Sequence, residues 1–163
     1  MSGSDPGSPL TIQFLFLFAL VLINAFFAAA EMAVVSVNKN KIKVLAQEGN
    51  KRAIAVQKLI ENPNRFLSTI QVAITLAGFL ASASAAVGMS DDLGQLLGRL
   101  GLSEVVAKDL AVVIVTIILS YVTLVLGELY PKRIALQHSE QIAMLVVRPI
   151  NFIALLSLSL IHI

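Results

Sequence analysis

A glycine, a glutamate and a proline near the end of an apolar run are the residues best suited to chemistry. Gly127 ends an uncharged run of 18 residues, and Glu128 and Pro131 follow it. Proline has no N–H to bond the carbonyl four residues back, so Pro131 leaves the Gly127 carbonyl free beside the Glu128 carboxylate. These two hard oxygens predict a cation site at a helix break formed by Pro131 and Lys132.

Glu31 and Glu128 are the only charged residues inside the three long apolar segments of the chain. An acid within a membrane helix is rare and indicates function by default. The alternative is that each carboxyl joins two helices, stays protonated, or pairs with a basic residue near the membrane surface.

Polar side chains in the first two apolar segments could supply further ligands. Asn24 and Glu31 are seven residues apart and share one face of a helix, and Thr69 and Gln71 begin the second segment. We therefore predict a set of metal ligands from all three segments: Glu128, Gly127, Glu31, Asn24, Thr69 and Gln71.

The third segment carries a polar stripe that leads to Gly127. Its members are Thr116, Ser120 and Thr123. The stripe predicts a polar approach to the cation site. The alternative is that these hydroxyls bond carbonyls of their own helix and only help packing.

The ligand types indicate a hard cation. Carboxylate, hydroxyl and amide oxygens suit Mg²⁺ or Ca²⁺ better than zinc or copper. The chain has no cysteine, and both histidines, His138 and His162, lie beyond the third segment. It has no HExxH, GxSxG or GxxxxGK motif, so we expect no enzymatic activity.

Small residues recur at every fourth position of the second segment. Gly78, Ser82 and Ala86 form a row that allows helix backbones to approach closely. This row predicts a surface for helix packing or dimerisation.

The composition is that of an all-α integral membrane protein. Of the 163 residues, 57% are hydrophobic and 13% are charged, against about a quarter charged in soluble domains. We expect three membrane-spanning helices, at about 11–37, 66–90 and 108–128. A net charge of +2 is too small to indicate nucleic-acid binding.

The two ends of the chain lie outside these spans. Residues 1–10 are rich in Gly, Ser and Pro, and we expect a disordered leader or a scar from expression. Arg148 and Pro149 divide the last apolar segment, so we predict interfacial helices at about 139–163. The sequence stops at Ile163 without a polar tail, from which we expect a further domain to follow.

Loop charges predict the orientation. Residues 38–65 carry a net charge of +5, whereas residues 89–109 carry −2. The positive-inside rule then places the first loop, with its expected juxtamembrane helices, in the cytoplasm and the N-terminus outside. Glu128 would lie toward the cytoplasmic side.

Three stretches together resemble the transmembrane domain of the CNNM/CorC family, also called hemolysin-C-like proteins with CBS domains. Asn24–Ala33 resembles the family's first helix, and Asn62–Gln71 resembles the entry into its second. Gly127–Ala135 contains the G-E-x-x-P-K signature at the end of the third helix. The resemblance covers nearly all of the chain after Leu10.

The resemblance implies a homodimer in the lipid bilayer of the plasma membrane, the inner membrane of a bacterium. It implies Mg²⁺ transport, as efflux exchanged against Na⁺, with Glu128 in the cation site and Gly127 and Pro131 at the break. It also implies cytoplasmic CBS domains, which bind ATP in many members and are missing from this sequence.

Two departures from the family pattern concern the ligands. Animal members tend to have serine where this chain has Ala28, and many members have Gly-Asn where it has Ala73-Ile74. Thr69 and Gln71 could compensate. The alternative function is a dimerisation anchor for cytoplasmic CBS-type domains, without transport.

Overall fold

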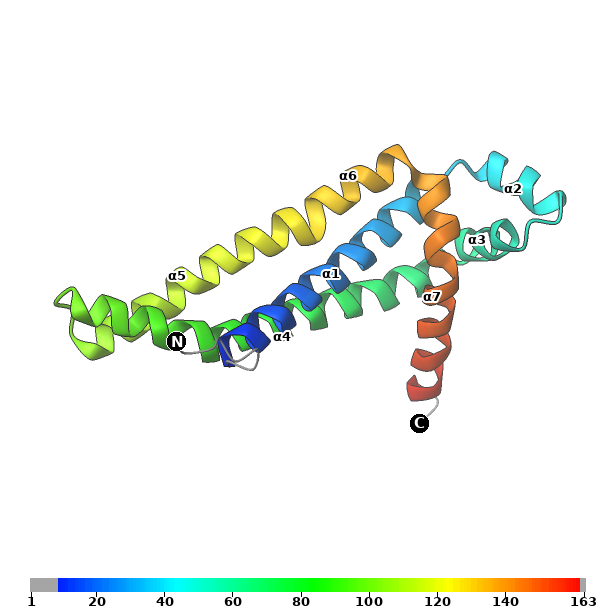
Figure 1. Ribbon diagram of the computed structural model, residues 1–163. Helices are drawn as coiled ribbons and strands as arrows, with labels where there is room; N and C mark the ends of the chain where they lie inside the picture. The colour runs from blue at the N-terminus through cyan, green and yellow to red at the C-terminus, as the bar shows by residue number, and fades with distance from the viewer. Residues whose placement is uncertain (1–8, 162–163) are drawn as a thin grey trace, which may run out of the picture.

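The computed structural model describes residues 9–161, and it describes side chains there except at 9, 10, 65, 85–88 and 153–161. Every element in this part of the chain is a helix (Figure 1). The elements are α1 (Pro9–Ser36), α2 (Lys39–Gln47), α3 (Lys51–Glu61), α4 (Pro63–Arg99), α5 (Glu104–Leu124), η1 (Val125–Leu129), α6 (Tyr130–Gln137) and α7 (Ser139–Ile161). The predicted all-α class is confirmed.

Three segments of the described chain are long and apolar enough to cross a membrane. The first, Thr11–Ser36, agrees with the predicted span. The others, Phe66–Arg99 and Glu104–Gln137, are longer than predicted. α4 continues past the acidic residues that we expected to lie in a loop, and the third segment continues through η1 and α6. Asp91 and Asp92 are exposed on this extension, so their charges are no obstacle to a helix.

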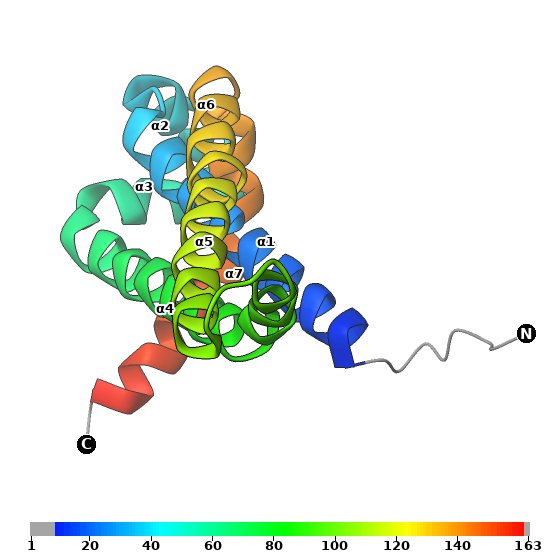
Figure 2. The same cartoon turned by 90° about the vertical axis from the view of Figure 1, so that its left-hand side faces the viewer.

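The three long helices run side by side (Figures 1 and 2). α4 contacts both α1 and α5, and α1 also contacts η1 and α6. Gly101 lies in the turn between α4 and α5 with a φ of +97°, a conformation that glycine adopts without steric cost. The bundle thereby brings η1 and α6, the last part of the third span, against α1.

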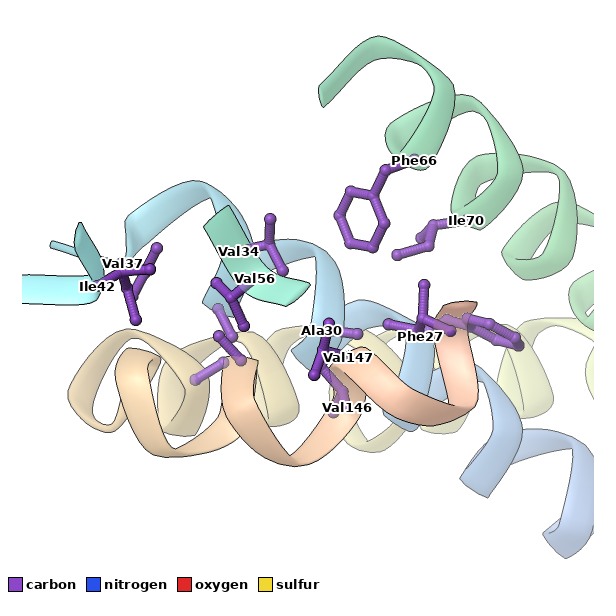
Figure 3. Close-up of a cluster of buried hydrophobic side chains, with 14 of the residues drawn as sticks. Phe27, Ala30, Val34, Val37, Ile42, Val56, Phe66, Ile70, Val146 and Val147 are labelled. Atoms are coloured by element: carbon purple, nitrogen blue, oxygen red, sulfur yellow. The ribbon is translucent and has the colours of Figure 1, made fainter. Parts of the chain in front are cut away.

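The main hydrophobic core lies where α2, α3 and α7 meet the bundle, and we call this the basic end of the molecule. Val34 of α1, Val56 of α3 and Val147 of α7 are buried together there (Figure 3). The six cations of α2 and α3 are exposed: Lys39, Lys41, Lys43, Lys51, Arg52 and Lys58.

Asparagine caps define the short helices of the basic end. The side chain of Asn38 accepts hydrogen bonds from the first turn of α2, and that of Asn50 does the same for α3. Gly49, with a φ of +85°, separates the two helices. The cap at Asn50 explains why α3 begins at Lys51.

The predicted division of the last segment at Pro149 is wrong, since α7 continues through it as one helix. Pro149 and Leu145, whose carbonyl lies four residues earlier, are both exposed, so the missing hydrogen bond falls on an open face. Figure 1 shows α7 lying across the long axis of the bundle, the direction expected of a helix on a membrane surface.

Candidate cation site

The predicted helix break at Pro131 is a π-helical turn instead. α5 passes into η1 (Val125–Leu129), where the N–H of Tyr130 bonds the carbonyl of Val125, five residues back. Pro131 then lies in the first turn of α6, where its missing N–H is tolerated. The chain stays helical throughout, and Lys132 belongs to α6. Single π-turns within helices are frequent at functional sites.

The π-turn places Gly127 against Asn24 of α1. The Asn24 Nδ2 donates a hydrogen bond of 3.2 Å to the buried carbonyl of Gly127. A Cβ at position 127 would lie 3.2 Å from that nitrogen and 3.6 Å from the Asn24 Cβ. A side chain at position 127 would press against the Asn24 amide, so glycine favours this close approach. Two predicted ligands thus lie together.

The other end of the Asn24 amide has no partner among the described residues. Asn24 is 4% exposed, and its Oδ1 is buried without a hydrogen bond. Leaving a buried acceptor unpaired costs about 1–3 kcal/mol. The hydrogen bond to Gly127 fixes the amide, so this oxygen is held ready for a donor or a cation.

Lys132 joins the two intramembrane acids. Its Nζ lies 2.8 Å from Oε1 of Glu128 and 3.3 Å from Oε2 of Glu31. The three side chains come from α6, η1 and α1, and all three are partly buried. This arrangement matches the alternative given by the sequence, in which each acid pairs with a basic residue. The i,i+4 spacing of Glu128 and Lys132 indicates their ion pair, whereas no sequence spacing indicates the pair of Lys132 with Glu31.

A cleft of about 370 Å³ lies between α1, α4 and the end of α5. Asn24 and Glu128 line it together with four hydroxyl residues: Thr75, Ser82, Ser120 and Thr123. The remaining lining residues are apolar or glycine: Ile74, Gly78, Phe79, Leu119 and Leu124. The cleft thus combines one carboxylate, one amide and several hydroxyls in apolar surroundings.

Several predicted residues lie outside this cleft. Thr69, Gln71, Glu31 and Thr116 are not among the described residues that line it. Gln71 is exposed, and its backbone carbonyl accepts a hydrogen bond of 2.8 Å from Thr75 Oγ1. The hydroxyl residues of the second segment that line the cleft are Thr75, one helical turn beyond Gln71, and Ser82.

The small-residue row contributes to the cleft rather than to packing within the chain. Ser82 and Gly78 line it, and a Cβ added to Gly78 would meet no atom within 4 Å. The side chain of Ala86, like His162, lies outside the part that the structure describes. Gly78 and Ser82 thus lie at the cleft, and dimerisation through this row stays a prediction.

Within residues 9–161 no group of three or more His, Cys, Asp or Glu side chains is placed to hold a metal ion. A cation in the cleft would therefore meet the single carboxylate of Glu128 and otherwise neutral oxygens. Such a set suits a hard ion that keeps part of its water shell.

The family model described as the Cyclin M transmembrane N-terminal domain, CNNM, matches residues 15–163. This chain belongs to the CNNM family. The family resemblance predicted from the three sequence stretches is confirmed.

Curated bacterial relatives of this CNNM domain agree with the assignment. It is 36% identical to UPF0053 protein sll0260 of Synechocystis over 95% of this chain and 35% of that protein. It is 33% identical to UPF0053 protein YhdT of Bacillus subtilis over 84% of this chain and 30% of that one. It is 31% identical to a protein of Haemophilus influenzae named polyamine export protein, over 82% of this chain and 31% of that protein. The chain spans about a third of the length of these relatives.

Proposed function

We propose that this CNNM domain transports Mg²⁺ and binds it in the cleft beside Asn24 and Glu128. The observation that carries the proposal is the buried, unpartnered Oδ1 of Asn24 in the same cleft as the Glu128 carboxylate. A divalent ion, or a water bound to it, would satisfy that oxygen. Gly127 contributes by holding the Asn24 amide in place.

The hydroxyl residues favour a partly hydrated ion. Mg²⁺ gives up its waters reluctantly and usually keeps several of them in proteins. Thr75, Ser82, Ser120 and Thr123 provide hydrogen-bonding groups for such waters, and a cleft of about 370 Å³ leaves room for them. The departure at Ala28 is thereby offset by hydroxyls on α4 and α5.

The remaining parts of the function follow from the distribution of charge and from the family. The exposed cations of α2 and α3 support a cytoplasmic basic end and an outside N-terminus in a bacterial inner membrane. Mg²⁺ efflux coupled to Na⁺ entry, a homodimer, and regulation by ATP-binding CBS domains belong to the same proposal.

The binding step can be tested on the purified domain in detergent. Mg²⁺ at 100 times its dissociation constant should stabilise the fold by about 2.7 kcal/mol, measured as a rise in melting temperature. Glu128→Gln should remove this rise, whereas the matched variant Glu104→Gln, exposed at the start of α5, should keep it. An equal rise in both variants would show that the ion binds elsewhere.

A second candidate substrate is an organic polycation. The ammonium of Lys132 already lies between Glu31 and Glu128, so this pair of carboxylates accepts a primary ammonium. One relative is named a polyamine export protein. Spermidine should then stabilise the domain in place of Mg²⁺, and Glu31→Gln should weaken the effect. If neither cation stabilises the domain, the non-transporting anchor is the better account.

A further inference from the structure

Lys132 occupies the place where the charge of a substrate cation would go. Its ammonium contacts Glu128, the one carboxylate of the cleft, at 2.8 Å, and Glu31 of α1 at 3.3 Å. The three groups lie in the part of the molecule that belongs to two membrane spans. Charges that are partly withdrawn from water must be closely balanced, because water screens them less.

We propose that Lys132 is a tethered counter-ion that the substrate cation displaces from Glu128. This inference rests on the proposed function, since it requires a cation at Glu128. Without substrate, Lys132 neutralises one of the two carboxylates and prevents their mutual repulsion. When the substrate cation binds Glu128, the Lys132 ammonium leaves that carboxylate, so the ammonium and the substrate do not share it.

Charge balance gives the direction of the exchange. A divalent cation added to Glu31, Glu128 and Lys132 would leave the group with an excess positive charge. Withdrawal of the ammonium toward water leaves two carboxylates against one divalent ion, which is neutral. The lysine stem is long and flexible and can extend its charged end toward the membrane surface. The side chain of Lys132 is already 23% exposed, so this movement need not unpack a buried side chain.

The exchange also links the site to helix contacts. Lys132 lies on α6 and Glu31 on α1, and their ion pair is one of the contacts that hold these helices together. Displacement of the ammonium removes that contact while the cleft is filled. Return of the ammonium to Glu128 competes with the bound ion and favours its release.

Chemical labelling of lysines tests the displacement in the native domain. The domain in detergent is treated briefly with an amine-reactive ester, with and without saturating MgCl₂, and the modification of each lysine is measured by mass spectrometry. Modification of Lys132 should rise severalfold with Mg²⁺. Lys43, exposed on α2, is the control and should not change.

The outcomes separate this inference from the proposed function. If Mg²⁺ raises the melting temperature through Glu128 and Lys132 stays protected, the displacement is refuted and the transport site stands. If Mg²⁺ does not bind at Glu128, both proposals fail. As a second measurement, Lys132→Met should tighten the apparent Mg²⁺ affinity about tenfold, and an unchanged or weaker affinity would contradict the competition.

Discussion

Asn24 is held by only one end of its amide. Its nitrogen is bonded to the Gly127 carbonyl, and its oxygen is buried without a partner among the described residues. The free protein thus carries a cost of about 1–3 kcal/mol that a ligand can recover on binding. Both the position and the orientation of that oxygen depend on how closely Gly127 approaches.

Gly127→Ala should damage the site through this contact. The new Cβ would lie 3.2 Å from Asn24 Nδ2, so Asn24 must move, at a cost of about 1–3 kcal/mol for overpacking. We expect a lower melting temperature and a smaller Mg²⁺-dependent rise. Gly98→Ala is the control, because its Cβ would meet nothing within 4 Å, and alanine favours a helix by about 1 kcal/mol. Equal behaviour of the two variants would contradict the tight contact.

The hydroxyls of α5 provide a matched pair of variants. Ser120 lines the cleft, whereas Thr116, one turn earlier, is exposed and does not. Ser120→Ala should weaken Mg²⁺ binding about fivefold, as expected for the loss of one hydrogen bond of about 1 kcal/mol. Thr116→Ala should leave the affinity unchanged. Titration of the melting temperature with Mg²⁺ measures both, and a larger effect at Thr116 would favour a different path for the ion.

At the scale of the element, the π-turn η1 decides which group bonds the Gly127 carbonyl. Pro131 has no N–H with which to restore the α-helical bond to that carbonyl, and Asn24 takes its place. Pro131→Ala supplies the missing donor. We expect the α-helical bond to form, the Asn24 amide to be released, and Mg²⁺ affinity to fall while the domain stays folded. Unchanged affinity together with an unchanged melting temperature would mean that the π-turn does not depend on the proline.

The sequence predicted the elements where local chemistry defines them. Apolar length predicts the three spans and their approximate positions. The end of α4 was misjudged because Asp91 and Asp92 suggest a loop, although acids are tolerated on an exposed helix. Pro149 predicts a division, although it only removes one hydrogen bond on an exposed face of α7.

The candidate site could be predicted only in part. Asn24, Gly127 and Glu128 were identified from residue type and helical spacing, and they do lie together. The π-turn was not foreseen, because a change of hydrogen-bond register leaves no mark in the apolar pattern. Without that register, the ion pair of Lys132 with Glu31 of α1 could not be derived, although the spacing of Lys132 and Glu128 is visible in the sequence. Which residue of α4 lines the cleft, Gln71 or Thr75, depends on how that helix packs.

At the scale of the whole molecule, the two ends of the bundle differ in charge. Six exposed cations lie on α2 and α3, next to the largest core, while Asp91, Asp92 and Glu104 are exposed around the turn between α4 and α5. The positive-inside rule applies to short loops such as these. This polarity predicts which end of the bundle faces the cytoplasm.

Single cysteines can test this orientation, because the chain has none of its own. Lys43→Cys places a thiol on exposed α2, and Asp91→Cys places one at the opposite end of the bundle. In intact cells, a membrane-impermeant maleimide should label position 91 and spare position 43. Permeabilised cells should show labelling at both, which controls for reactivity. Labelling of position 43 alone in intact cells would contradict the predicted topology. The exposed cations of α2 and α3 would then lie outside, and Glu128 would lie toward the outer side of the membrane.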